Sequence, residues 1–220
     1  MATTDDYGQG VSIASLTDAP NAEALAKNIA NALAQRSIMR FASASARNAT
    51  ITSPADGMVA WLRDSKLLTV HNGTAWLPYL GTAVANQQSP SYDATITTYG
   101  TSSSAGSYAH CAVTFVAPLS GKVKITTGAR VENSSSTAGC LLTPETREGS
   151  SIGSGAIVEA AIDINGFSHY GATYARATAS HLLTGLTPGA SYNTRLLHRT
   201  SQSGTTATFA LRELIVEPAA

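Results

Sequence analysis

The fold class is decided by one alternating stretch, Lys122-Val123-Lys124-Ile125-Thr126-Thr127-Gly128-Ala129-Arg130-Val131-Glu132. Alternation with a period of two is the pattern of a β-strand that buries one face and exposes the other. A second stretch, Cys111 to Ala117, repeats it, with apolar residues at every other position. In the first stretch the side expected to be buried consists of Val123, Ile125, Thr127, Ala129 and Val131.

Further strand-like runs surround these two, and clusters of Gly, Pro, Asn and Ser separate them. Many short strands with regular turn signals indicate a mainly β fold, a β-sandwich that resembles a jelly roll. We expect strands at 94–99, 108–116, 122–132, 139–142, 156–164, 172–177, 181–184, 192–199 and 206–216.

Four segments follow from this pattern. Residues 1–40 are expected to hold an N-terminal arm and an oligomerisation helix, and residues 41–82 a β-hairpin segment. Residues 83–90 have no periodicity and predict a linker. Residues 91–220 are expected to form the sandwich, a suitable length for one domain.

The helix is predicted over 21–36, where good helix formers run without a glycine. Its apolar residues recur at helical spacing and include Leu25, Ile29 and Leu33. Two interpretations stay open on this pattern alone. The stripe either docks on the helix's own domain or forms a short coiled coil between copies, and it covers only about two heptads.

The segment 57–77 predicts a small meander, with turns at 63–66 and at Asn72-Gly73. Such a meander is marginally stable by itself. It carries large apolar side chains that need a partner surface, and symmetric self-association supplies one. The residues expected at contacts between copies are therefore Leu25, Ile29 and Leu33 of the helix and Trp61, Leu68 and Trp76 of the meander.

Composition excludes several function classes. The chain has 14 basic and 14 acidic residues, and charged residues make up only 13% of it. No Lys/Arg cluster could neutralise a row of phosphates, so we expect no nucleic-acid binding. No apolar run reaches the roughly 18 residues of a membrane span, so we expect no membrane insertion. The acidic, polar N-terminus lacks the features of a secretion signal, which predicts synthesis in the cytosol.

Motifs that carry chemistry are missing from the sequence. It contains no HExxH, P-loop or GxGxxG pattern, and its five histidines lack metal-ligand spacing. Cys111 and Cys140 have no CxxC partner and are expected to be buried thiols. We therefore expect no enzymatic activity, no metal and no cofactor.

A resemblance adds a context to this pattern. The segments 3–11, 39–47 and 57–76, with a Gly-Met start and a Gly-x-x-Trp end to the meander, resemble minor tail and fibre proteins of phages and prophages of actinobacteria. The likeness covers about a third of the chain, and its motifs are structural. It implies a homotrimeric virion component that contacts other virion proteins through its N-terminal region.

Two functions are compatible with that context. The first is a short trimeric tail fibre or spike, whose C-terminal domain attaches to the host by binding a cell-wall glycan with several weak sites at once. The second is a capsid decoration or head fibre without a receptor pocket. A glycan-binding module or enzyme unrelated to any virus is a third, remote alternative, which a stable monomer would favour.

Aromatic side chains are the candidates for contact with a sugar, because their flat faces are amphipathic. Some of them must belong to the core instead, and the sequence does not separate the two groups. The candidates for surface binding are Tyr92, Tyr99, Tyr108, His169, Tyr170 and Tyr174.

Overall fold

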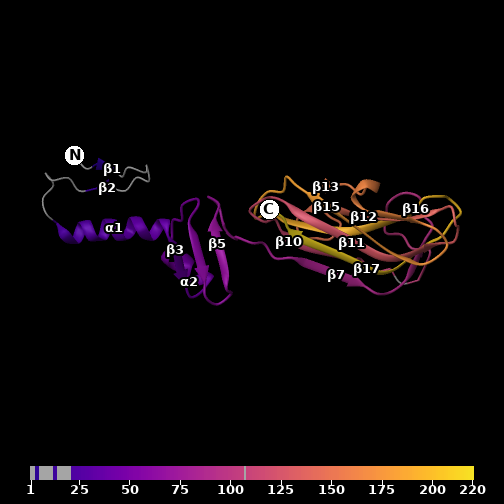
Figure 1. Ribbon diagram of the computed structural model, residues 1–220, viewed down its shortest axis with the longest axis horizontal. Helices are drawn as coiled ribbons and strands as arrows, with labels where there is room; N and C mark the ends of the chain where they lie inside the picture. The colour runs from indigo at the N-terminus through magenta and orange to yellow at the C-terminus, as the bar shows by residue number, and fades with distance from the viewer. Residues whose placement is uncertain (1–2, 5–11, 14–20, 107) are drawn as a thin grey trace. The chain divides into compact units, whose positions relative to one another are not determined.

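The computed structural model describes residues 3–4, 12–13, 21–106 and 108–220 (Figure 1). It divides into two compact units, Met1–Tyr79 and Leu80–Ala220. The expected arm before the helix lies largely outside the described residues, apart from a short antiparallel pair, β1 (Thr3–Thr4) and β2 (Ser12–Ile13).

The N-terminal unit contains the predicted helix, α1 (Ala22–Arg36). The side chain of Asn21 caps it by accepting a hydrogen bond from the Ala24 N–H at 2.9 Å. Glu23 lies in the first turn and Arg36 in the last, where their charges interact favourably with the helix dipole.

A four-stranded sheet forms the rest of this unit, in the order β3-β4-β5-β6. The predicted meander is present as β4 (Val59–Leu62), β5 (Leu67–His71) and β6 (Trp76–Pro78). Two elements were not predicted: β3 (Ile38–Phe41), which pairs in parallel with β4, and the connecting helix α2 (Ala44–Thr50). Ser43 caps α2, because its hydroxyl accepts the Ala46 N–H at 3.1 Å.

The C-terminal unit is β-rich, as the alternating stretches predict, and its sheets are consistent with a sandwich. One sheet has the order β10-β16-β12-β13, with β14 also paired to β12. It is built from β10 (Ala112–Val116), β12 (Gly139–Glu148), β13 (Ile157–Glu159), β14 (Phe167–Tyr170) and β16 (Ser191–Thr200).

The other sheet has the order β15-β11-β17-β8-β9, with β7 also paired to β17. In the first sheet, a short 3₁₀ helix, η1 (Asp163–Asn165), precedes β14, whereas the described residues of the second sheet form strands only. The strands of this sheet are β7 (Val84–Gln88), β8 (Tyr92–Ala94), β9 (Ala105–Gly106), β11 (Val123–Asn133), β15 (Ala175–Leu183) and β17 (Ala207–Pro218).

The predicted linker is wrong. Val84–Gln88 is β7, which pairs antiparallel with β17 from Val84↔Val216 to Gln88↔Arg212. Its Asn and Gln residues give no strand-like apolar pattern, so the sequence does not predict this strand. Backbone pairing with β17 determines its conformation. The expected strands 172–177 and 181–184 are likewise one continuous strand, β15, which pairs with β11.

The buried face of β11 is confirmed. Each of its five predicted side chains, Val123 to Val131, is at most 1% exposed. Cys111, Val113, Phe115 and Ala117 are buried against the same core. Both cysteines are free thiols, and burial raises the pKa of Cys111 to about 11 and that of Cys140 to about 12.

Candidate functional site

The apolar stripe of α1 is exposed to solvent. Leu25 is 41% exposed, Ile29 47% and Leu33 66%. Among the side chains of α1 that the structure describes, only that of Ala32 is half-buried. Isolated helices of about 12–15 residues are marginal in water, and their stability in proteins comes from packing of the apolar face. A fifteen-residue helix with this stripe uncovered therefore needs another surface to pack on.

The two faces of the small sheet differ. Residues paired across strands share a face, so Trp61 and its partner Leu68 lie together, next to Val59 and its partner Val70. All four side chains are half-buried, and Ile38, paired with Val59, is 59% exposed. This set, Ile38, Val59, Trp61, Leu68 and Val70, is called the open sheet face below.

Trp76 does not belong to the open sheet face. Its neighbour across the strands is His71, and the Arg47 guanidinium of α2 lies 4.4 Å from the centre of the Trp76 ring. Arg47 also donates to the Thr69 hydroxyl at 3.0 Å, which places α2 over this second face. The six residues predicted for contacts between copies are thus divided among an exposed helix stripe, the open sheet face and the α2 side of the sheet.

Tyr92 is a core residue, and its prediction as a surface-binding residue is wrong. Its side chain is 1% exposed and stacks on Phe209 at 5.5 Å between ring centres. The Tyr92 hydroxyl lies 2.8 Å from His198 Nδ1, and His198 Nε2 lies 2.9 Å from the Ser102 carbonyl oxygen. A carbonyl oxygen only accepts, so Nε2 carries the proton and Tyr92 donates to Nδ1.

Tyr108 and Tyr99 are half-buried. Tyr108 packs edge-on against Tyr92, with 5.1 Å between the ring centres. Tyr99 donates from its hydroxyl to Asp163 at 2.7 Å, and Arg199 holds the same carboxylate through both oxygens at 2.9 and 2.7 Å. Burial and the bond to Asp163 raise the pKa of Tyr99. This tyrosine has a fixed position near the surface, whereas Tyr108 extends the core cluster.

The remaining candidates lie close together in the chain, at the connection between β14 and β15. Tyr170 is 57% exposed and Tyr174 40% exposed, with the Arg130 guanidinium 4.0 Å from the centre of the Tyr174 ring. His169 donates from Nε2 to the Thr173 carbonyl at 3.1 Å. Exposed aromatic faces beside a cation are compatible with contact to a surface glycan.

A buried arginine was missed by the sequence analysis. Arg212 is 1% exposed, lies 4.5 Å from the centre of the Tyr92 ring, and donates from Nη1 to the Ala109 carbonyl at 2.7 Å. Its Nε and Nη2 atoms have no hydrogen-bond partner within the described part of the chain. A bulge explains why the burial of Arg212 was not predicted. Leu211 has a φ of 48° and shifts the alternation of β17 by one residue, which turns Arg212 toward the core.

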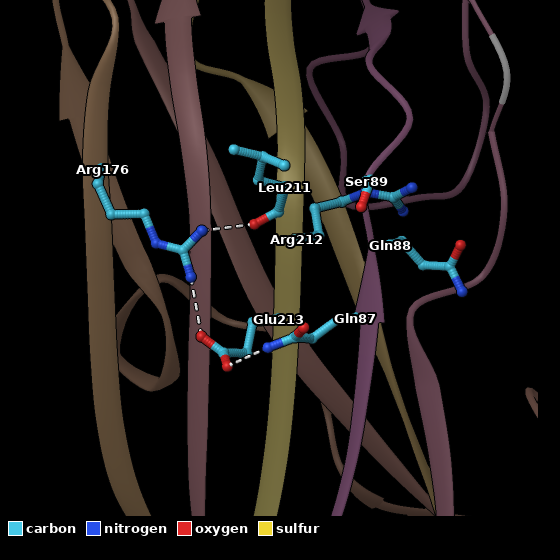
Figure 2. Close-up of a pocket in the computed structure, with 7 residues that line it drawn as sticks. All are labelled: Gln87, Gln88, Ser89, Arg176, Leu211, Arg212 and Glu213. Carbon is cyan, nitrogen blue, oxygen red and sulfur yellow. Dashed lines mark hydrogen bonds and ion pairs between the residues drawn. The ribbon is translucent and has the colours of Figure 1, made fainter.

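A small pocket lies beside this bulge (Figure 2). On it, Glu213 accepts from Arg176 and from Gln87, both at 2.8 Å. Every lining residue except Leu211 is polar, and Arg176 and Glu213 form an ion pair, which favours a solvated surface. The residues that line it are Gln87, Gln88, Ser89, Arg176, Leu211, Arg212 and Glu213.

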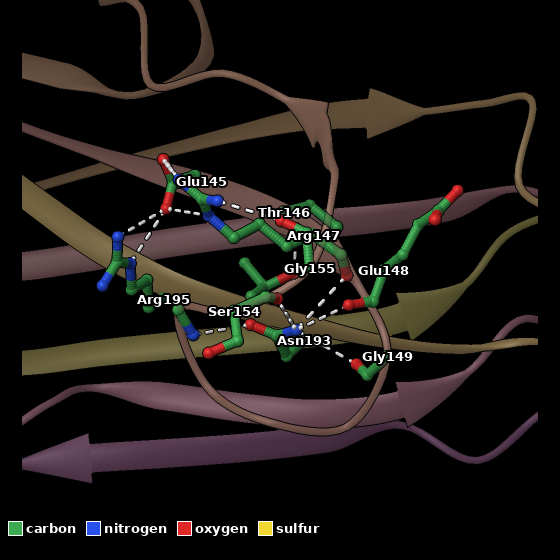
Figure 3. A network of polar contacts seen from close by, with 11 residues as sticks. Glu145, Thr146, Arg147, Glu148, Gly149, Ser154, Gly155, Asn193 and Arg195 are labelled. Atoms are coloured by element: carbon green, nitrogen blue, oxygen red, sulfur yellow. Dashed lines mark hydrogen bonds and ion pairs between the residues drawn. The ribbon is translucent and has the colours of Figure 1, made fainter.

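A second polar network stabilises the loop after β12 (Figure 3). Glu145 accepts from Arg147 and Arg195, with 2.8 Å separations in both ion pairs. Burial raises the pKa of Glu145, and the hydrogen bonds from the two arginines outweigh it, so the pKa lies below its usual value. These pairs stabilise the charged carboxylate and leave it no evident role as a proton donor or acceptor.

In the part of the chain that the structure describes, no group of three or more His, Cys, Asp or Glu side chains could hold a metal ion. No helix in the same residues is long and apolar enough to cross a membrane.

Comparison with known proteins assigns no family. No protein-family model and no curated protein matches the chain. Among solved structures, "Structure of infectious bursal disease virus Gx strain" matches with a TM-score of 0.34 and 10% identity, over 67% of this chain and 36% of that one. "Structure of infectious bursal disease virus Gt strain" matches with a TM-score of 0.33 and 10% identity, over 69% and 40%. The chain thus spans well under half the length of either match.

Proposed function

We propose that the chain is a non-enzymatic structural protein of a bacteriophage particle, a short homotrimeric fibre or spike. The uncovered stripe of α1, with Leu25, Ile29 and Leu33 all exposed, carries the proposal. A helix whose apolar stripe the described residues leave exposed is stabilised when copies of it pack together. The trimeric state and the phage context rest on the resemblance of the N-terminal segments to phage tail and fibre proteins.

The open sheet face supports the same conclusion. Trp61 and Leu68 form a cross-strand apolar pair, and Ile38 adds an exposed aliphatic side chain. Large aromatic side chains at the centre of an apolar patch contribute strongly to interfaces. We propose that this face, together with the α1 stripe, forms the contacts between copies.

The sandwich is the part that meets the host surface in this proposal. Tyr170 and Tyr174, with Tyr99 held by Asp163, are its candidate contacts with a cell-wall glycan. Three copies on one assembly would multiply weak binding to a repeated sugar. A passive capsid decoration would share the assembly and lack this binding.

The association is tested by a pair of variants on adjacent positions of α1. Ile29→Asp places a charge on the stripe, and Asn28→Asp places the same charge beside it on the polar side. Light scattering after size exclusion is expected to show a large loss of assembly for Ile29→Asp and little change for Asn28→Asp. Equal masses for both variants and the unaltered chain would show that the stripe is not part of an interface between copies.

The virion role has its own test, on purified particles of the phage that encodes the chain. Immunogold labelling with an antibody against residues 80–220 is expected to mark the particle at its tail. Labelling confined to the head would favour the decoration alternative. Particles that lack the chain altogether would rule out both.

A further inference from the structure

A hollow in the N-terminal unit lies on the α2 side of the sheet, opposite the open sheet face. Its volume is about 460 Å³, within the range of small-ligand sites. The residues of it that matter here are Arg47 and Asn48 of α2, His71 of β5, Thr74 of the turn and Trp76 of β6. Neither the proposed contacts between copies nor the sandwich uses this hollow.

Arg47 is a buried cation with neutral partners. Its side chain is 5% exposed, and it donates to the Asn48 side-chain oxygen from Nε at 3.1 Å and from Nη2 at 3.0 Å. Within the described ranges, no carboxylate forms an ion pair with it. Burial of an unpaired charge is costly, so an anion beside this guanidinium would be stabilised.

His71 supplies a second polar group. Its side chain is 4% exposed and lines the hollow, and its buried Nδ1 has no hydrogen-bond partner among the residues that the structure describes. Buried polar atoms in proteins are almost always paired, so this imidazole adds polar character to the wall of the hollow without a fixed partner at Nδ1. The imidazole also packs edge-on against Trp76, at 5.3 Å between ring centres, which fixes its orientation.

Trp76 adds an aromatic surface to these two groups. The Arg47 guanidinium lies over its ring, 4.4 Å from the centre, and the side chain is half-buried. A tryptophan with hydroxyl and amide groups around it, here Thr74 and Asn48, suits a ligand that has both an apolar face and many hydroxyls. A sugar ring has that character.

We propose that this hollow binds an anionic sugar, with its carboxylate or phosphate at Arg47 and its ring against Trp76. The shared chemistry of the two anions is a negative group that accepts from a guanidinium. The site adds a contact with surface glycans in the N-terminal unit, and it is independent of binding by the sandwich.

The chain offers a direct readout, because its only two tryptophans lie on opposite faces of the sheet. Each indole N–H gives one signal in a proton–nitrogen NMR spectrum, and Trp61→Phe assigns them. Sodium glucuronate and glucose 6-phosphate, each added to about 20 mM, are expected to shift the Trp76 signal and leave the Trp61 signal in place, with millimolar affinity. Glucose is expected to bind at least about 10-fold more weakly.

A matched pair of arginine variants completes the test. Arg47→Gln is expected to weaken glucuronate binding by about 10-fold or more, and Arg63→Gln, in the exposed turn of the same unit, to leave it unchanged. The NMR readout on the unaltered chain stands even if Arg47→Gln fails to fold. An unmoved Trp76 signal, equal binding of glucose, or an equal response to acetate or phosphate alone would overturn the proposal. Light scattering of the same samples reports the assembly separately, so failure here leaves the proposed trimer intact.

Discussion

The His198 side chain shows how one buried residue couples this fold to pH. It is fully buried, and burial lowers its pKa to about 4 while the Ser102 carbonyl opposes the shift. A histidine in the unfolded chain has a pKa of about 6.5. As the pH falls below that value the unfolded state takes up a proton first, so stability is lost between about pH 6.5 and pH 4.

We predict that His198→Gln makes the stability less dependent on pH in this interval, by up to about 3 kcal/mol. Urea unfolding of the C-terminal unit at pH 7, 6, 5 and 4 measures the difference. Leu196→Ala, a buried change on the same strand, serves as the control and should keep the dependence of the unaltered chain. An unchanged dependence in His198→Gln would contradict the assignment.

Arg212 leads to a second prediction at the scale of a residue. Desolvation of its charge costs several kcal/mol, and two of its nitrogens find no partner among residues 21–106 and 108–220. Contacts with the rings of Tyr92 and Tyr108 recover part of that cost. Arg212→Met keeps the apolar volume and removes the charge. Its free energy of unfolding is expected to stay within about 1 kcal/mol of the unaltered chain, or to rise.

The control for this change is Leu214→Ala, two residues along the same face of β17. It leaves a cavity and should cost about 2–5 kcal/mol. Chemical denaturation of both variants gives the comparison. If Arg212→Met is as destabilising as Leu214→Ala, the guanidinium stabilises the fold by more than its contacts in the structure explain, and the prediction is wrong.

At the scale of an element, Asn193 of β16 holds the loop between β12 and β13. Its Oδ1 accepts the Gly153 N–H at 2.9 Å, and its Nδ2 lies 3.0 to 3.4 Å from four carbonyl oxygens, two at the end of β12 and two in the loop (Figure 3). Asn193→Asp keeps the shape but turns a carboxylate oxygen toward those carbonyls. The four are the carbonyls of Arg147, Glu148, Gly149 and Ser154.

We predict that Asn193→Asp destabilises the C-terminal unit by about 2 kcal/mol or more, since buried acceptors lose their donor and face a charge. Amide hydrogen exchange should speed up across residues 149–155. Ser151→Ala, an exposed change in the same loop, should stay within about 0.5 kcal/mol of the unaltered chain. Unchanged exchange in Asn193→Asp would show that the loop is held by other contacts.

The elements also show what the sequence can and cannot predict. The period of two identified β11 and its buried face because the pattern is long and one face of the strand packs in the core. Strand β7 was missed, since its Asn and Gln residues carry no apolar pattern and its conformation comes from pairing with β17. Helix α2 has a sequence signal, the cap residue Ser43, but only seven residues.

The candidate site was less predictable than the fold. Tyr92 and Tyr170 are alike in sequence terms, yet one is 1% exposed and the other 57%. The difference arises from which strand faces the core, and this depends on contacts between residues far apart in the chain. Trp61 and Trp76 are separated for the same reason, because pairing of β4, β5 and β6 sets their faces.

At the scale of the whole molecule, the two units differ in how completely they bury their apolar side chains. The C-terminal unit buries its own apolar core, with residues such as Ile125, Leu142 and Phe209 fully enclosed. The N-terminal unit leaves the α1 stripe and the open sheet face in contact with solvent. This contrast supports the proposal that copies of the chain associate through the N-terminal unit.

The most direct test is the mass of the unaltered full chain in solution, measured by sedimentation equilibrium over a range of micromolar concentrations. One chain has a mass of 22.6 kDa. The account predicts a stable species with three times that mass. A species of single-chain mass at every concentration would contradict it, because the apolar stripe of α1 would then remain uncovered in the folded protein.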